Sequence, residues 1–170
     1  MGGTIDVESV LGKGSTFTIT IPHKIANKDY TNRNIESSNE FDIDFVGKRI
    51  LLAEDNALNA EITTTILTDM GFEVKAVEDG ILCVNEIQHQ PANTYDLILM
   101  DIQMPNMDGY KATHVIRRLS SPEKANIPII AMSANAFEED KKMAFASGMN
   151  DHVAKPIDMN VLLPTIMKYM

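Results

Sequence analysis

The stretch that decides the fold is Leu97-Ile98-Leu99-Met100-Asp101-Ile102-Gln103-Met104-Pro105. Four apolar residues lead to one carboxylate, and a proline loop with Gly109 follows, so this short run predicts a buried strand that ends at Asp101. Ligands of α/β sheets bind at the carboxyl ends of the strands, and we expect Asp101 to face such a crevice. A single aspartate after a strand is also typical of a helix cap or a turn, so the assignment depends on the rest of the chain.

Three more apolar runs end in polar residues in the same way. The run that starts at Ile50 ends in Glu54-Asp55-Asn56, the run at Ile129 ends in Ser133, and the run at Val153 ends in Lys155 before a proline. Parallel strands bring their carboxyl ends to one edge of a sheet. The sequence therefore predicts that three acids, a hydroxyl and an amine gather at that edge.

Strand and helix patterns alternate from Val46 onward, which indicates an α/β fold with a parallel sheet. We predict strands over 49–53, 73–77, 97–101, 127–133 and 151–154. The predicted helices are one with Leu58, Ile62, Ile66 and Met70 on one face, then 80–88, 110–119 and 137–147, and a last helix that starts near Asp158. Pro164 lies inside the last helix, where it removes a hydrogen bond, so we expect a kink or a late start there.

The motifs Glu54-Asp55-Asn56, Met100 to Pro105, Ser133-Ala134-Asn135-Ala136 and Lys155-Pro156-Ile157 together resemble the receiver domain of two-component response regulators. They are most similar to receivers fused to hybrid histidine kinases, and the resemblance runs from about Val46 to the end. It implies a flavodoxin-like three-layer sandwich, with a five-stranded parallel sheet of order 2-1-3-4-5 flanked by five helices. It also favours a cis peptide bond between Lys155 and Pro156.

The resemblance implies a role for each residue of the cluster. Asp101 would be the nucleophile and the phosphorylation site, and Lys155 and Ser133 would contact the phosphoryl group. Asp55, Asp101 and the backbone carbonyl of Gln103 would bind Mg²⁺ directly, and Glu54 through water. His152 stands where receivers often have an aromatic switch residue, and a histidine there could switch or stay fixed.

Charge repulsion supports a metal independently of the resemblance. Two carboxylates at ~4 Å repel by about 4 kcal/mol at an effective dielectric constant of ~20. Three of them in one crevice need a counter-charge, and Mg²⁺ prefers carboxylate and water oxygens.

The expected function is a phospho-accepting receiver in a phosphorelay. It would take phosphate from the phosphohistidine domain of a histidine kinase, which we expect to belong to the same parent protein. It would then pass the phosphate to a histidine phosphotransfer protein or lose it by hydrolysis. A phosphorylation-silent interaction module is one alternative. A haloacid-dehalogenase-like phosphatase is another, but that family has a second aspartate two residues after the nucleophile, where this chain has Gln103.

The first 22 residues predict a β-hairpin, because apolar and β-branched residues alternate on both sides of Gly12-Lys13-Gly14-Ser15. This segment resembles the last glycine box and the closing strands of a histidine-kinase ATP-binding domain. The other nucleotide-contacting boxes are not seen, so we expect no ATP binding. A lone hairpin is marginal in water, so we expect it to fray, dock or pair with another copy. Residues 23–45 are polar and predict a linker to the receiver at 46–170.

The composition restricts the kinds of partner and the compartment that we expect for this chain. The net charge of −9 argues against a nucleic-acid-binding surface. The single cysteine excludes an internal disulfide framework. We see no signal peptide and no apolar run long enough for a membrane span, so we expect a cytoplasmic chain whose parent could be anchored in a membrane elsewhere. The chain alone is not expected to be a kinase.

Overall fold

The computed structural model describes residues 2–22, 45–134 and 138–170. Its contacts divide the chain into two units, Met1–Ile43 and Asp44–Met170, which we describe separately. The predicted linker lies outside the described residues except for its last residue, Phe45. That side chain is 5% exposed and its ring stacks on Phe72 at 4.3 Å between centroids. Phe45 therefore belongs to the core of the second unit.

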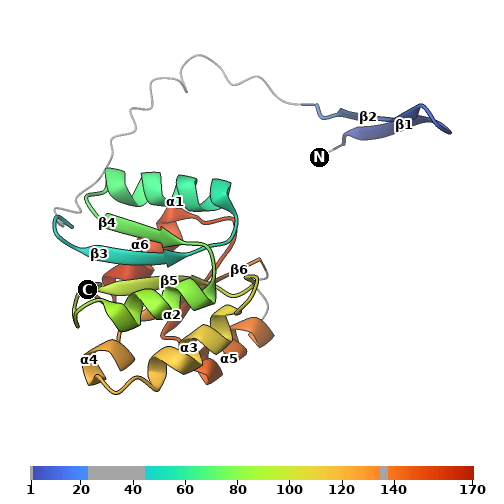
Figure 1. The fold of residues 1–170 in the computed structure, drawn as a ribbon. Helices are drawn as coiled ribbons and strands as arrows, with labels where there is room; N and C mark the ends of the chain where they lie inside the picture. Colours follow the sequence, from blue (N-terminus) through green and yellow to red (C-terminus); the bar gives the residue numbers. More distant parts are fainter. Residues whose placement is uncertain (1, 23–44, 135–137) are drawn as a thin grey trace, which may run out of the picture. The chain divides into compact units, whose positions relative to one another are not determined.

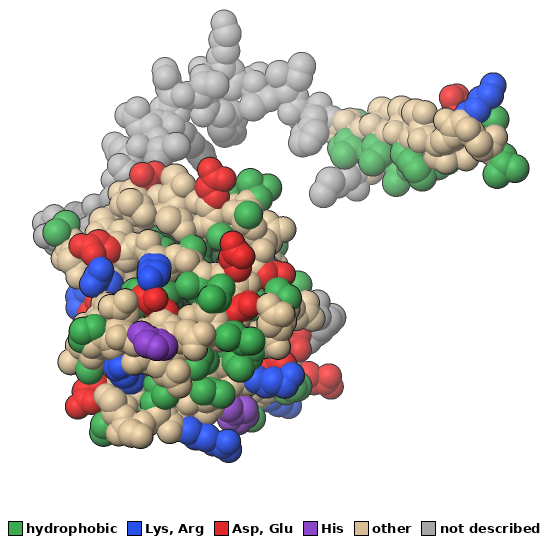
Figure 2. All heavy atoms as spheres, viewed as in Figure 1, with side chains coloured by type: hydrophobic (Ala, Val, Ile, Leu, Met, Phe, Trp, Pro, Cys, Tyr) green, Lys and Arg blue, Asp and Glu red, His purple; other side chains and the backbone are tan. Residues whose placement is uncertain are grey.

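The first unit contains the predicted hairpin. Strands β1 (Thr4–Val10) and β2 (Gly14–Thr20) pair antiparallel, with Ile5 opposite Ile19 and Val7 opposite Phe17. Side chains that lie opposite each other point to the same face of a pair. The ribbon therefore has one apolar side, visible in Figure 2, and every residue of both strands is exposed.

The second unit is built on a five-stranded sheet. Its strands are β3 (Arg49–Ala53), β4 (Glu73–Val77), β5 (Leu97–Asp101), β6 (Ile129–Ser133) and β7 (Asp151–Ala154). All four pairings are parallel, and the order β4-β3-β5-β6-β7 confirms the expected 2-1-3-4-5 arrangement (Figure 1). Four strands have the predicted bounds. β6 begins at Ile129 instead of Ile127 because Pro128 has no N–H for the strand ladder.

The described part of this unit has six helices where five were expected. They are α1 (Ala57–Asp69), α2 (Gly80–His89), α3 (Gly109–Arg117), α4 (Pro122–Ala125), α5 (Glu138–Ser147) and α6 (Met159–Met167). The unexpected α4 is a single turn whose N-cap is Ser121. Asp158 is the N-cap of α6 and the helix continues through Pro164, so the late start is wrong. Within the described ranges, no helix combines the length and apolar character needed to cross a membrane.

Helices cover both faces of the sheet, as Figure 1 shows, and divide the core in two. One cluster joins Leu51 and Ile98 to buried side chains of α2, α3 and α5. The other joins Ile50 and Leu99 to buried side chains of α1 and α6. Because alternate residues of a strand point to opposite faces, β3, β5 and β6 bury apolar side chains on both sides.

The face of helix α1 that packs against the sheet is not the apolar face that its sequence predicts. Thr63 and Leu67 point into the core, whereas Leu58 and Ile62 are 64% and 49% exposed. The four-residue spacing correctly predicts the helix. It also places two large apolar side chains in solvent, beside the carboxyl edge of the sheet.

Candidate functional site

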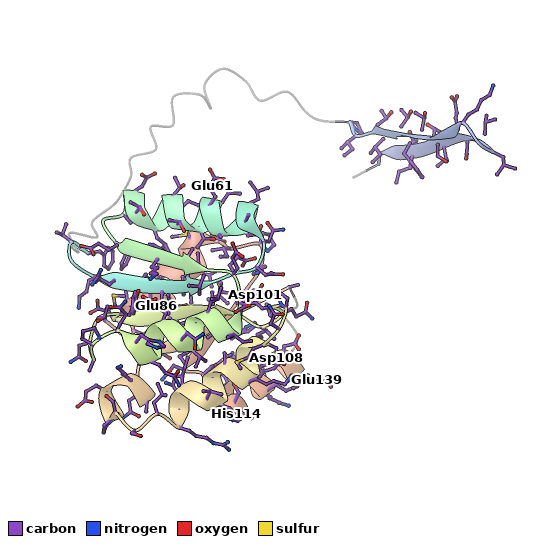
Figure 3. All side chains as sticks on the ribbon, viewed as in Figure 1. Glu61, Glu86, Asp101, Asp108, His114 and Glu139 are labelled. Atoms are coloured by element: carbon purple, nitrogen blue, oxygen red, sulfur yellow. The ribbon has the colours of Figure 1, made fainter. Side chains whose placement is uncertain are left out.

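The carboxylates predicted from separate strands meet at the carboxyl edge of the sheet. Glu54 and Asp55 follow β3. Asp101, labelled in Figure 3, is the last residue of the neighbouring β5. One oxygen from each of the three lies within 4.8 Å of the others. They line a crevice of about 280 Å³, whose wall also contains Gln103 and Lys155. Glu54 and Asp101 are buried, while Asp55 is exposed, so the crevice is open to solvent on the Asp55 side.

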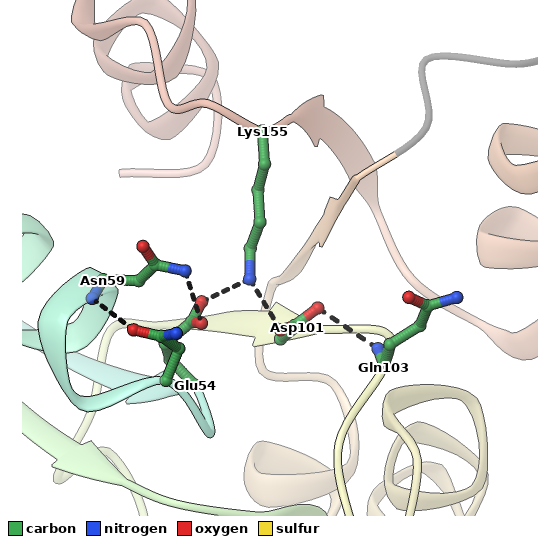
Figure 4. Close-up of polar contacts among 6 residues, drawn as sticks. Glu54, Asn59, Asp101, Gln103 and Lys155 are labelled. Carbon is green, nitrogen blue, oxygen red and sulfur yellow. Dashed lines mark hydrogen bonds and ion pairs between the residues drawn. The ribbon is translucent and has the colours of Figure 1, made fainter. Parts of the chain in front are cut away.

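Lys155 connects two of the acids. Its Nζ donates to Glu54 Oε2 at 2.5 Å and to Asp101 Oδ2 at 2.6 Å (Figure 4). The other oxygen of Asp101 accepts the backbone N–H of Gln103 at 3.1 Å. The Lys155–Pro156 peptide bond is cis, as predicted.

Asn59 is a member of the site that sequence reasoning missed. Its Nδ2 donates to Glu54 Oε1 at 3.1 Å, and its backbone N–H is capped by Asn56 Oδ1 at 3.1 Å. Asn59 lies in the first turn of α1, which begins just after the β3 acids. A polar side chain in the first turn after an acidic strand end was the available signal.

The electrostatics of the site leave negative charge unbalanced. Three ionised carboxylates and one ammonium give a formal charge of −2. Burial raises the pKa of Asp101, against the opposing effect of Lys155. Burial disfavours the charged form of Lys155, but hydrogen bonds to Asp101 and Glu54 outweigh it and raise the pKa of Lys155. A divalent cation would complete the charge balance, and the donors are the oxygens that Mg²⁺ prefers.

Ser133 and His152 lie beside this crevice but pair with each other. Ser133 ends β6, His152 lies in β7, and Ser133 Oγ is 2.7 Å from His152 Nε2. Ser133 is 4% exposed and His152 is half-buried. Burial lowers the pKa of His152, which favours the neutral imidazole at neutral pH. The structure therefore brings Glu54, Asp55, Asp101, Gln103 and Lys155 together around one crevice, and forms a separate Ser133–His152 pair next to it.

Known proteins are similar to this chain in fold and in sequence. The "Sensor protein GacS" of Pseudomonas syringae is 40% identical over 122 residues, which are 71% of this chain and 13% of that protein. The receiver domain of the sensor histidine kinase PA1611 from Pseudomonas aeruginosa, crystallised with magnesium in its active-site cleft, superposes with a TM-score of 0.65. It is 38% identical, and the match covers 73% of this chain and 98% of that one.

A third relative is the receiver domain of Ssk1 from Saccharomyces cerevisiae, in a co-crystal with the histidine phosphotransfer protein Ypd1. It has a TM-score of 0.64 at 29% identity and covers 74% of this chain and 90% of that one. The chain spans only 7 to 15% of the length of the curated relatives it matches. The family model "Response regulator receiver domain" matches residues 50–167, which contain every residue of the crevice and all of the sheet except Arg49, the first residue of β3. This chain belongs to the response regulator receiver family.

Proposed function

We propose that Asp101 accepts a phosphoryl group from a phosphohistidine and passes it to a histidine of a phosphotransfer domain, or loses it to water. The observation that carries this proposal is the surroundings of Asp101: Lys155 on one oxygen, the Gln103 amide on the other, and two more acids within 4.8 Å. A structural aspartate would not need two further acids beside it. An acceptor that works with a divalent cation does.

The transfer forms one bond and breaks one. An oxygen of Asp101 bonds to phosphorus while the P–N bond of the phosphohistidine breaks, and the electron pair stays on the imidazole nitrogen. The product is an acyl phosphate on Asp101. Lys155 then exchanges its contact with Asp101 Oδ2 for a phosphoryl oxygen, to which it offers a point charge. The reverse sequence delivers the phosphoryl group to a second histidine.

The residues present fit Mg²⁺, which would be held by Asp55, Asp101 and the carbonyl of Gln103, with Glu54 acting through water. The bound cation would supply positive charge for the phosphoryl oxygens. The charge of −2 and the open side of the crevice at Asp55 support this assignment. The PA1611 receiver was crystallised with magnesium in its own cleft.

Ser133 and His152 form the proposed switch. Ser133 would turn from His152 Nε2 to a phosphoryl oxygen once the group is bound, which releases or reorients the histidine in β7. A phosphoryl group adds charge and strong acceptor oxygens and biases such a two-state element. We expect the change to reach α5, β7 and α6, because His152 lies in β7 and β7 contacts both helices.

The exposed apolar face of α1 supports a protein partner for the transfer. Ile62, Ile66, Ile157 and Met159 line a groove of about 180 Å³ that reaches Lys155 and Glu54. Ile62 is exposed on the wall of this groove, and Leu58 is exposed one turn earlier on α1. An apolar face bordering a reactive crevice fits a helical domain that presents a histidine. The Ssk1 receiver was crystallised with a histidine phosphotransfer protein.

The larger protein in this proposal is a hybrid histidine kinase whose receiver lies in the cytoplasm, and its own phosphohistidine domain is the donor. The hairpin would be the end of its ATP-binding domain, followed by the linker and the receiver. Support comes from the hairpin motif and from the sensor proteins that the chain matches.

One experiment tests the acceptor. The chain is incubated with Mg²⁺ and acetyl phosphate, and intact mass spectrometry followed by peptide mapping measures acid-stable, base-labile phosphate. One phosphate on Asp101 is expected. No incorporation would favour the phosphorylation-silent interaction module instead.

A second experiment tests the partner face. Ile62→Asp should slow transfer from a phosphohistidine donor by about tenfold or more while labelling by acetyl phosphate stays unchanged. The matched control is Ile81→Asp, an exposed apolar residue at the start of α2. Equal effects of the two variants would contradict the assignment of the α1 face.

A further inference from the structure

The loop between β5 and α3 carries Gln103 and is fixed at both ends. The N–H of Ile102 donates to the Met132 carbonyl and the N–H of Gly109 donates to the Ile102 carbonyl, both at 3.0 Å. Figure 3 labels Asp101 and Asp108 on either side of it. Its middle reaches solvent at Asn106, whose φ of 61° is in the left-handed region. Such a backbone conformation is held by its surroundings, and here the surroundings are the corner between β4 and α2.

Asp79 is the unexpected residue of that corner. It is 7% exposed, and among the described ion pairs none involves it. One oxygen caps α2 by accepting the N–H of Leu82 at 2.7 Å. The other accepts Nδ2 of Asn106, also at 2.7 Å. Capping uses only one oxygen, so the second binds the loop 27 residues further along the chain.

Gly80 adds a second contact to the same loop. Its N–H donates to the Met107 carbonyl at 3.2 Å, and a Cβ at this position would lie 2.5 Å from that oxygen. On the other side, a Cβ at Gly109 would lie 2.3 Å from the carbonyl oxygen of Asp101. The loop is thus held between the Asp79-Gly80 corner and the end of β5, with no room for a side chain at either glycine.

We propose that Asp79 and Asn106 are positioning residues of the phosphorylation site, because their hydrogen bond fixes the loop that holds the Gln103 backbone beside the Asp101 carboxylate. This inference rests on the proposed function, in which both groups bind the cation. Neither Asp79 nor Asn106 lines the crevice itself. They act through the loop backbone, as outer partners orient the ligands of other metal sites.

An amide swap tests the pair with little change to the fold. In Asp79→Asn the remaining carbonyl oxygen still caps α2, since asparagine is as good an N-cap as aspartate. The new amide nitrogen, however, faces Nδ2 of Asn106, so two donors meet unless the Asn106 amide turns over, and in either arrangement the charged acceptor is lost. The double variant Asp79→Asn with Asn106→Asp restores one donor and one acceptor with the direction reversed, and aspartate tolerates the left-handed conformation.

The readouts are the Mg²⁺ dissociation constant from calorimetry of the full chain and the rate of phosphorylation by acetyl phosphate. We expect Asp79→Asn to weaken Mg²⁺ binding by about tenfold, with a matching loss of rate, and the double variant to recover to within about threefold of wild type. Asn106→Gly, in which the left-handed φ causes no strain, should weaken binding similarly. Urea unfolding of each variant measures any general loss of stability.

The outcomes are distinct. Wild-type Mg²⁺ binding in both Asp79→Asn and Asn106→Gly would overturn the inference, even if either variant were less stable. Equal impairment of the single and double variants would also overturn it, because the effect would then follow from the charge or the cap. If the wild-type chain binds no Mg²⁺ and takes no phosphate, the proposed function itself fails, and that result is visible before any variant is made.

Discussion

Two long cationic side chains, Lys155 and Arg117, lie at opposite edges of the parallel sheet and have different partners. At the carboxyl edge, Lys155 meets two carboxylates in a cluster that still has excess negative charge. At the amino edge, Arg117 donates only to neutral acceptors. These are the carbonyls of Gly148, Ala125 and Ile127 and the side chain of Asn150, at 2.7 to 2.8 Å.

The partners of the two side chains indicate different roles: Arg117 joins structural elements, and Lys155 belongs to the reactive site. The guanidinium of Arg117 ties the end of α3 to α4 and to the segments that enter β6 and β7, and Asn150 Oδ1 also accepts the N–H of Ile129. Its acceptors carry no charge, so they offer a divalent cation no anionic ligand, and its four hydrogen bonds join segments of the chain. The Lys155 contacts are ion pairs that a divalent cation or a phosphoryl group can replace. Excess negative charge, more than burial, marks the reactive edge.

Removing the acceptor should have the largest effect. We expect Asp101→Asn to reduce phosphate incorporation to background, because an amide is a poor nucleophile and a poorer metal ligand. The amide can keep the hydrogen bond from the Gln103 N–H, so the fold should be retained. Intact mass after reaction with acetyl phosphate measures the first effect and circular dichroism the second. Single-site labelling of this variant at the wild-type rate would refute the assignment.

Removing Arg117 from the amino edge should have the opposite effect, a loss of stability with phosphorylation unchanged. Arg117→Ala leaves three carbonyls and an amide oxygen without their charged donor, and we expect a loss of about 3 kcal/mol in the free energy of unfolding. Phosphorylation per folded molecule should stay at the wild-type level. The matched control is Arg118→Ala, at the exposed next residue, which should change stability by less than about 0.5 kcal/mol. Urea unfolding provides the measurement. A lower phosphorylation rate in folded Arg117→Ala would show that the two edges are coupled.

The pH dependence of stability gives a smaller effect at the reactive edge. Burial raises the pKa of Asp101 above its ordinary 3.8, so the folded chain holds more protons than the unfolded chain between these two values. Wild-type stability should therefore fall as pH rises through that window, relative to Asp101→Asn, and the difference should then stay constant. Unfolding of both proteins across acidic to neutral pH, without Mg²⁺, tests this. A difference that shrinks with rising pH would mean that Lys155 dominates the environment of Asp101.

The sequence predicts the sheet better than the contacts between its connections. Apolar runs such as those ending at Ala53 and Asp101 are buried on both faces, so their pattern defines strands and strand ends. Helix α4 was missed because one turn is too short for a periodic pattern, although Ser121 before a proline is typical of a helix start. The apolar stripe of α1 has the spacing of a core face, yet Leu58 and Ile62 are exposed.

The same limit applies to the site. Glu54, Asp55, Asp101 and Lys155 could be predicted together because each ends a strand of one parallel sheet. The bonds from Asn59 to Glu54 and from Asn106 to Asp79 join side chains through the packing of loops and helix starts. The hydrogen bonds of Arg117 reach 8 to 33 residues along the chain. Alternation along a strand or a helix contains no information about such contacts.

The smallest effect should come from removing the first unit. Both edges of the sheet belong to the second unit, and none of their contacts described above involves residues 2–22. A chain that begins at Phe45 should keep wild-type Mg²⁺ affinity and phosphorylation, with stability changed by less than about 0.5 kcal/mol. It should also self-associate less, because the exposed apolar side of the hairpin, including Val7, Phe17 and Ile19, is gone.

The start point of the truncated chain matters. A matched chain that begins at Val46 loses the buried ring of Phe45 and its stacking on Phe72, so it should be measurably less stable than the chain that begins at Phe45. Analytical ultracentrifugation and urea unfolding compare the three chains. If the Phe45 chain failed to fold or to accept phosphate, the hairpin would be part of the receiver's stability, and the contrast between the two edges would have to include it.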